Sequence, residues 1–279
     1  MRARPVVTFL TDFGAQDPYV GIMKGVVLGI CPDASLVDLC HEIPAHDILH
    51  GSFLLHMAVG AFPAGTIHVA VVDPGVGGAR RPILADIDGQ FFVGPDNGVL
   101  SYPLATAERY QVRRLSVETF WRHPVSASFH GRDIFAPVAG HLAAGVDPDR
   151  FGPVIADPVR LETPRPQADA AGRVQGQVMR VDRFGNCLTN IPGYLVAGTP
   201  PERGGQVVVW VGGRQIGRFV RTFADVAAGE AGAFVGSAAY VELFCNQGHL
   251  AREGRVGPGD PVTLERTTAV GTRGRAGAH

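Results

Sequence analysis

The sequence predicts an N-terminal α/β domain with a largely parallel central sheet, followed by a smaller domain of short β-strands. Three observations lead to this fold class. In the first half, apolar β-branched runs alternate with segments of helical spacing, which favours βαβ units. After Gly145 the periodicity gives way to a stretch rich in Pro, Asp and Arg. From Arg173 onward, short alternating strands separated by turn signals are typical of a small antiparallel barrel or sandwich.

The composition is that of a globular protein with a full core. The 279 residues are 46% hydrophobic and 18% charged, which suits one large domain or two of ordinary size. The net charge of -1 provides no basic surface for nucleic acid and no polybasic segment for a membrane. No apolar run approaches the roughly 18 residues that span a bilayer. We therefore expect neither nucleic acid nor a membrane as a partner.

The ends of the chain and the cysteines predict a cytoplasmic protein. The N-terminus leads directly into an apolar strand, which leaves no room for a signal peptide. The four cysteines are scattered and form no CxxC pair, which favours reduced thiols over disulfides or a zinc site. His41, Glu42 and His46 are of ligand-like types, but nothing in their spacing establishes a metal geometry, and we expect no metal.

Periodicity and turn residues define the elements of the first half. Asp17 and Pro18 form a typical helix start, with the aspartate as N-cap and the proline at the first helical position. The expected strands cover residues 6–10, 35–39, 67–72, 83–87, 90–93 and 112–115, and the expected helices cover residues 19–30, 47–61, 99–105 and 134–144.

The second half is predicted to be all β. The expected strands cover residues 174–181, 206–211, 214–220, 239–244 and 261–264. The predicted organisation is an α/β domain over residues 1–160, a linker over 161–172, a β-domain over 173–268 and a disordered tail over 269–279.

The strand at residues 67–72 ends in the most informative loop of the chain. Asp73 follows the strand directly, three glycines come within the next five residues, and two arginines, Arg80 and Arg81, follow within reach of the acid. In open α/β sheets, ligands bind outside the carboxyl ends of the strands, so this loop is a candidate site. Asp12 likewise ends a strand, and His130 precedes a helix whose N-terminus favours an anion or a polarised oxygen. The alternative is a strand-ending turn with solvated arginines.

Two polar turns in the second half are also candidates. Asp182 and Asn186 surround one glycine turn, and Ser237 begins a stretch that ends at Cys245, Asn246 and Gln247. These side chains suit a ligand rich in hydroxyl and amino groups, such as a nucleoside or an amino acid. Ordinary turn chemistry explains the same residue types.

Several motifs together resemble one family. In order they are Thr11-Asp-Phe-Gly, Val72-Asp-Pro-Gly-Val-Gly77, Gly94-Pro-Asp-Asn-Gly98, Phe129-His-Gly-Arg-Asp-Ile-Phe-Ala-Pro137, Asp182-Arg-Phe-Gly-Asn186 and Thr189-Asn190. Over roughly residues 5 to 266 the chain resembles the S-adenosyl-L-methionine hydrolases, or hydroxide adenosyltransferases, which are siblings of the bacterial fluorinase and chlorinase. The resemblance implies a C-terminal β-barrel, and a homotrimer whose sites each join the N-terminal domain of one subunit to the C-terminal domain of its neighbour. It also implies that water attacks the ribose C5′ of S-adenosyl-L-methionine, the small-molecule substrate, and releases adenosine and L-methionine without a cofactor.

The resemblance also implies roles for individual residues. Asp73, Arg80 and His130 match the trio at the water site, and the halide-using relatives lack the matching Asp and His. The substrate-binding residues that it implies are Asp12 for the ribose hydroxyls, Asp17 and Tyr19 in the next loop, Asp182, Asn186 and Ser237 for the methionine end, Phe223 for stacking on adenine, and Cys245, Asn246 and Gln247 for the adenine edge. Glu242, from the same stretch as Ser237, is a further candidate for binding the substrate. Leu188 stands where the fluorinase has Trp, so stacking on the base is built differently here.

The chemistry agrees with these residue types. The sulfonium leaving group is already activated, whereas bulk water has a pKa of about 15.7, so the nucleophile is the difficulty. Arg80 supplies a permanent positive charge, and His130 can exchange a proton near neutral pH. Asp73 either orients these groups or accepts the first proton, and the sequence leaves both roles open. The alternative functions are a halogenase and a nucleoside-binding trimer without turnover.

Overall fold

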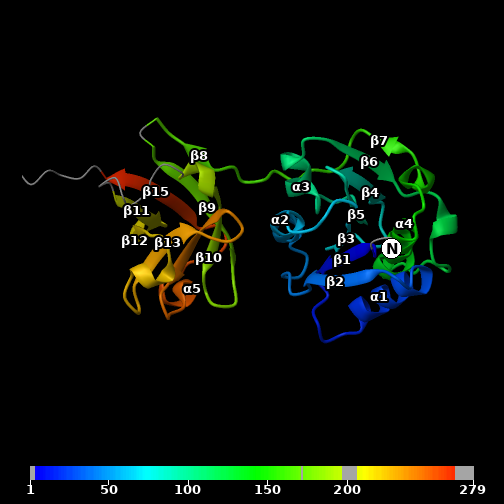
Figure 1. The fold of residues 1–279 in the computed structure, drawn as a ribbon, viewed down its shortest axis with the longest axis horizontal. Helices are drawn as coiled ribbons and strands as arrows, with labels where there is room; N and C mark the ends of the chain where they lie inside the picture. The colour runs from blue at the N-terminus through cyan, green and yellow to red at the C-terminus, as the bar shows by residue number, and fades with distance from the viewer. Residues whose placement is uncertain (1–3, 171, 197–205, 268–279) are drawn as a thin grey trace, which may run out of the picture. The chain divides into compact units, whose positions relative to one another are not determined.

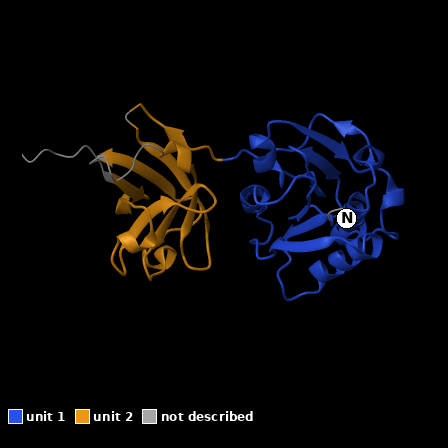
Figure 2. Ribbon diagram, viewed as in Figure 1, with its two compact units in different colours: residues 1–163 blue, residues 164–279 orange. Residues whose placement is uncertain are grey.

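The structure is a computed structural model that describes residues 4–170, 172–196 and 206–267. The predicted tail at 269–279 lies outside the described residues. The chain divides into two compact units, residues 1–163 and 164–279 (Figure 2). The division falls within the stretch 161–172 that was expected to be a linker.

The first unit is built on a seven-stranded sheet with the order β2-β1-β3-β5-β4-β6-β7 (Figure 1). The four strands β2, β1, β3 and β5 are parallel, and the other pairings are antiparallel. The prediction of a largely parallel central sheet is therefore confirmed. The strands are β1 (Val6–Thr11), β2 (Ser35–Cys40), β3 (Ile67–Val71), β4 (Pro82–Ile87), β5 (Gln90–Pro95), β6 (Tyr110–Arg114) and β7 (Val154–Ile155).

Helices cover both faces of this sheet. On one face, Met23 of α1 (Tyr19–Ile30) and Val138 of α4 (Ala136–Ala143) pack against strand residues such as Phe9. On the other face, α2 (Ile48–Val59) and α3 (Ser101–Thr106) pack against residues such as Leu10. The apolar runs of β1 and β3 are buried on both sides, which is why they lack a polar alternation. The remaining turns are η1 (Glu118–Phe120), the π-helical η2 (Gly131–Phe135) and η3 (Pro148–Phe151).

Helix α1 covers the expected residues, but its N-cap differs from the prediction. Pro18, not Asp17, is the N-cap residue, and the helix has no side-chain cap bond. The ψ of Pro18 is 3°, which is outside the helical range, so the proline precedes the first helical residue instead of occupying that position. Helix α2 does have a side-chain cap, because Asp47 accepts a hydrogen bond from the His50 N–H at 3.0 Å.

The second unit is a closed barrel of seven strands. Strands β10-β14-β13-β12-β11-β15-β9 follow one another, β9 pairs back to β10, and β8 extends β9 on the outside. Every pairing is antiparallel except the one between β12 and β13. The predicted β-barrel is confirmed. The elements are β8 (Gln167–Ala168), β9 (Val174–Val181), β10 (Cys187–Pro192), η4 (Gly193–Leu195), β11 (Gln206–Val211), β12 (Arg214–Phe219), η6 (Phe223–Asp225), β13 (Ala231–Val235), β14 (Tyr240–Cys245), α5 (Leu250–Glu253) and β15 (Pro261–Thr267).

The barrel has an apolar core of its own, which includes Val178, Ile191, Val209, Leu243 and Val262, each 0% exposed. Within the described residues, none of the helices has the length and apolar character needed to cross a bilayer.

Candidate active site

Asp73, Arg80 and His130 lie in contact at the end of β3. The Nε of Arg80 donates to both carboxylate oxygens of Asp73 at 3.1 Å, and its Nη2 donates to Oδ2 at 2.5 Å. The same Nη2 lies 2.7 Å from Nδ1 of His130. The side chains of Arg80 and Asp73 are only 9% and 4% exposed, so the guanidinium joins the acid to the imidazole with little exposure to solvent.

The loop between Asp73 and Arg80 is folded by its glycines. Gly77 has a φ of +75°, a conformation that favours glycine. A Cβ at this position would lie 2.2 Å from the carbonyl oxygen of Ala127. Glycine therefore lets the loop after β3 contact the segment just before His130. This close approach brings together residues that are 50 positions apart in the chain.

The contact with Arg80 defines the protonation of His130. A guanidinium only donates hydrogen bonds, so Nδ1 is the acceptor and the neutral ring carries its proton on Nε2. Burial lowers the pKa of His130, the positive charge of Arg80 lowers it further, and the charges of Asp73 and Asp133 act in the opposite direction. The net shift is downward, so the imidazole is neutral at pH 7. Nε2–H is then free to donate to a ligand.

His130 immediately precedes the π-helical turn η2, which leads into α4. Isolated π turns are frequent at functional sites. The guanidinium of Arg80 also lies 5.4 Å from the ring centroid of Phe135, at the end of this turn. The guanidinium of Arg80 thus contacts His130 at the beginning of this turn and Phe135 at its end.

Arg81, the second arginine of the loop, has different partners. Its Nε donates to Asp96 at 2.8 Å and its Nη1 donates to Asp157 at 2.9 Å. It therefore ties the loop to the segment near residue 157 rather than taking part in the trio.

Asp12 follows β1, the strand next to β3, at the same sheet edge. Its carboxylate accepts a hydrogen bond from the His46 N–H at 2.9 Å. The preceding Thr11 is held through its Oγ1, which lies 2.9 Å from Nδ1 of His41, and Nε2 of His41 lies 2.8 Å from Asp38. His41 is thus a supporting residue of this loop.

Tyr19 joins the Asp12 loop to the His130 segment. Its ring packs edge-to-face on Phe129 at 5.4 Å and on Phe13 at 5.9 Å. Tyr19 is 45% exposed, so part of the ring remains available to a ligand. Asp17 lies exposed in the same loop. The first unit therefore brings its predicted site residues to one edge of the sheet.

In the second unit, Asp182 and Asn186 bind each other within one turn. Oδ1 of Asp182 accepts the N–H groups of Phe184 and Asn186, both at 2.9 Å, and Oδ2 accepts the Asn186 side-chain amide at 3.1 Å. The turn chemistry that the sequence allowed as an alternative is therefore present. Burial raises the pKa of Glu242 on β14, the negative charge of Asp182 raises it further, and the charge of Arg180 acts in the opposite direction. Ser237 lies exposed in the turn before β14.

The residues predicted to bind adenine also cluster. Phe223 is 42% exposed and packs edge-to-face on Phe244 at 4.7 Å. Cys245 follows Phe244, is buried, and has a pKa raised by burial and by Glu253. The Asn246 side chain donates to the carbonyl of Val226 at 2.8 Å, and Gln247 is exposed with a φ of 57°.

Two features of the site were not anticipated from the sequence. A Cβ at Gly185 would lie 2.1 Å from Nδ1 of His249, so the 182–186 turn lies beside the 245–249 turn. The second is Asp133, which lies three residues after His130 and is fully buried. The available signal for Asp133 was a carboxylate directly before the helix predicted at residues 134–144. Within the described residues, no group of three or more His, Cys, Asp or Glu side chains is arranged to hold a metal ion.

Comparisons with known proteins cover nearly the whole chain. The family model of the SAM hydroxide adenosyltransferase N-terminal domain matches residues 7–152, and that of the C-terminal domain matches residues 176–263. The (R)-S-adenosyl-L-methionine hydrolase of Thermus thermophilus is 38% identical over 269 residues, which are 94% of this chain and 99% of the relative. The hydrolase of the same name from Salinispora tropica is 39% identical, over 95% and 99% of the two chains.

A more distant relative and a solved structure are also similar to this chain. A fluorinase from Nocardia brasiliensis is 29% identical over 67% of this chain and 71% of its own length. The crystal structure of an uncharacterized conserved protein from Thermotoga maritima superposes with a TM-score of 0.89 at 34% identity, over 93% of this chain and all of the other. With both domain models matched in order and hydrolases of more than 35% identity along almost its full length, the chain belongs to the SAM hydroxide adenosyltransferase family.

Proposed function

We propose that this protein hydrolyses S-adenosyl-L-methionine to adenosine and L-methionine. The observation that carries the proposal is the continuous contact of Asp73, Arg80 and His130 at the carboxyl edge of the sheet, in a chain whose relatives are named as hydrolases of this substrate. In the reaction the C5′–S bond breaks, its electron pair stays on the sulfur of methionine, and water forms the new C5′–O bond. The water proton leaves as that bond forms.

We assign the three residues separate roles. Asp73 orients Arg80 and also accepts the proton, because a carboxylate has about four acceptor positions and Arg80 uses three of them. Arg80 holds His130 in the neutral form through Nδ1. His130 donates Nε2–H to the oxygen of the nucleophile and orients it. The low exposure of the acid and guanidinium strengthens these electrostatic interactions.

The remaining predicted residues bind the substrate. Asp12 is proposed to hold the ribose hydroxyls, with Asp17 and Tyr19 beside it. The methionine end is assigned to Asp182, Asn186, Ser237 and Glu242, and the adenine to Phe223, Cys245, Asn246 and Gln247. Burial and the charge of Asp182 raise the pKa of Glu242, and the positive charge of a ligand ammonium group would favour its ionised form, which supports the place of Glu242 near the methionine end.

The relatives are named as hydrolases of (R)-S-adenosyl-L-methionine, and we propose the same epimer preference here. No cofactor is needed, because the sulfonium leaves without activation. We also propose a homotrimer, which light scattering coupled to size exclusion will test. A cytoplasmic location is supported by the four cysteines, all of which are free thiols.

The test is direct. Purified protein, dialysed against a chelator, is incubated with the (R) and (S) epimers separately in oxygen-18 water, and the products are analysed by chromatography and mass spectrometry. We expect adenosine that carries the heavy oxygen at C5′, an equal amount of methionine, and faster turnover of the (R) epimer. Parallel incubations with chloride and fluoride detect a halogenase. A 5′-halo-adenosine in place of adenosine, or no product at all, would overturn the proposal.

A further inference from the structure

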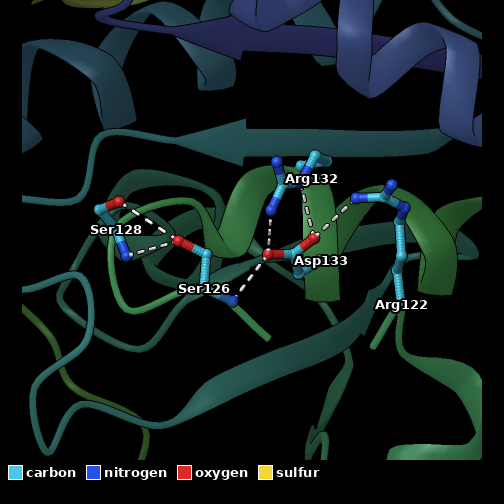
Figure 3. Close-up of polar contacts among 5 residues, drawn as sticks. All are labelled: Arg122, Ser126, Ser128, Arg132 and Asp133. Carbon is cyan, nitrogen blue, oxygen red and sulfur yellow. Dashed lines mark hydrogen bonds and ion pairs between the residues drawn. The ribbon is translucent and has the colours of Figure 1, made fainter. Parts of the chain in front are cut away.

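Asp133 is a carboxylate without exposure to solvent, held by donors from two directions (Figure 3). Oδ1 accepts from Nε of Arg132 at 2.7 Å and lies 3.5 Å from Nη1 of Arg122. Oδ2 accepts from Nη2 of Arg132 at 2.8 Å and from the backbone N–H of Ser126 at 2.9 Å. A buried charge is costly unless it is paired and hydrogen-bonded, and here both oxygens are. The proposed chemistry gives none of these four residues a part.

Asp133 and its neighbours hold the two ends of the segment that contains His130 together. The backbone carbonyl of Asp133 accepts the N–H of Arg122 at 2.8 Å, so residues 122–133 form a loop tied at its two ends. The carboxylate then pulls the middle of this loop inward through Ser126. His130 lies between the Ser126 contact and Asp133 itself. Arg132 adds a further restraint, because its guanidinium lies 5.2 Å from the ring centroid of Phe129, the neighbour of His130.

The same loop contacts the other half of the trio. Ala127 follows Ser126, and its carbonyl occupies the space that Gly77 leaves open by lacking a Cβ. Gly77 lies in the loop from Asp73 to Arg80. One buried carboxylate therefore controls both the backbone that presents His130 and the surface against which the Asp73–Arg80 loop packs.

We propose that Asp133 is a positioning residue that sets the separation between the Arg80 guanidinium and the His130 imidazole. The expected effect of Asp133 on kcat rests on the proposed hydrolysis, whereas its expected effect on the Arg80–His130 distance does not. Asp133 acts on the reaction only through His130 and the 126–128 turn. It is distinct from Asp73, whose carboxylate contacts Arg80 directly.

Asp133→Asn is the informative variant. The amide keeps the shape of the carboxylate but accepts only through its oxygen, so in either orientation its NH2 group faces an N–H donor of Arg132. We expect the loop to shift and kcat for adenosine formation to fall by about 100-fold, the scale for a misplacement on the order of 1 Å. KM should change by less than about threefold, because the loss falls on the chemical step rather than on uniform binding. A crystal structure should show the Arg80–His130 contact, 2.7 Å here, opened beyond hydrogen-bond range.

Two further variants make the test specific. Arg132→Lys keeps the charge but removes the two-pronged contact, and should lower kcat in the same direction in a protein that folds even if Asp133→Asn does not. Asp149→Asn makes the same acid-to-amide change at an ion pair with Arg113 whose carboxylate is 74% exposed, and should leave kcat unchanged.

Activity is expressed per folded molecule, with the folded fraction measured by circular dichroism. Lower thermal stability with wild-type kcat in both Asp133→Asn and Arg132→Lys would overturn the proposal and leave Asp133 a purely structural residue. An unchanged Arg80–His130 distance in Asp133→Asn would also overturn it. If the wild-type protein releases no adenosine, the proposed function fails, and the crystallographic distance alone decides whether Asp133 positions His130.

Discussion

Arg80 is the residue on which the trio is organised, since one guanidinium nitrogen contacts both the Asp73 carboxylate and the His130 imidazole. A lysine could not reproduce the whole arrangement, because its ammonium group lacks the planar fork through which Nε and Nη2 of Arg80 both bind the Asp73 carboxylate. The arrangement also makes His130 an acceptor at Nδ1, and so removes the freedom of tautomer that an isolated histidine has. The chemistry of each residue is therefore set by its neighbour.

Loss of either flanking residue should stop the chemistry without preventing binding. We expect Asp73→Asn and His130→Ala to slow adenosine release by at least about 100-fold, the usual scale for a positioned proton-transfer group, with a smaller change in the Kd of the substrate. Single-turnover chromatography and calorimetry measure the two quantities. Asp157→Asn, at an exposed carboxylate paired with the adjacent Arg81, is the matched control. Near-normal turnover in both trio variants would remove these residues from the mechanism.

The rate should depend on pH through His130. Burial, and then the charge of Arg80, lower the pKa of the imidazole from its ordinary 6.5. Only the neutral ring accepts from Arg80, so kcat/KM should be constant near neutral pH and should fall as the pH drops through this lowered pKa. A pH–rate profile in a constant-ionic-strength buffer tests the direction. An acid limb centred above 6.5 would contradict the assignment.

At the scale of elements, the site depends on loops that follow neighbouring parallel strands. Register places Thr11 of β1 opposite Val71 of β3, so Asp12 and the Asp73 loop leave the sheet side by side. The edge-to-face contacts of Phe13, Tyr19 and Phe129 then join the first loop to the His130 segment. The two paired strands anchor both loops at the same edge of the sheet, which helps to keep the reacting groups in place.

Gly77→Ala tests whether the two loops must touch. Both Gly77 and Gly89 have positive φ, +75° and +81°, but only a Cβ at Gly77 meets another backbone, at 2.2 Å from the Ala127 oxygen. Each alanine should lower the free energy of unfolding by about 1 kcal/mol, because alanine is strained at a positive φ. Gly77→Ala should lower it further because its Cβ clashes with the Ala127 oxygen. We expect adenosine formation to fall at least about tenfold only in Gly77→Ala. Equal kcat values in the two variants would mean that the loop contact has no role in turnover.

At the scale of the whole molecule, each unit has its own apolar core, with Phe9, Phe53 and Phe135 buried in the first and Val178 and Leu243 in the second. The residues proposed to contact the substrate are divided between them. The chain is therefore expected to be separable into folding units but not into active ones.

Separate expression of residues 4–163 and 164–267 checks this expectation. Each piece should show cooperative thermal unfolding and a near-ultraviolet circular dichroism spectrum, because each buries a continuous core. Neither piece alone should release adenosine, whereas the full chain should. If residues 4–163 alone released adenosine, the first unit would be sufficient for the reaction. That result would contradict the proposed roles of Asp182 and Phe223.

Local patterns in the sequence were sufficient for most of the fold. The run from Ile67 was expected to be a buried strand, and β3 is Ile67–Val71, because a β-branched apolar run of this length has few alternatives to a buried strand. Strands β10 and β13 were not expected. The amides and glycine around Asp182–Asn190 indicated a turn, and the small residues of Ala231–Val235 have weak strand propensity, so their pairing partners decide their structure.

The sequence by itself determined the two-part architecture and placed Asp73 and two arginines around one glycine-rich loop. Only the tertiary structure decided that His130 meets Arg80 from 50 residues away, that Arg81 turns to Asp96 instead, and that Asp133 is buried beneath the loop. The physical reason is one of range. Propensity and periodicity act within a few residues, whereas the tautomer of His130 and the placement of a buried charge depend on which segments the sheet brings together.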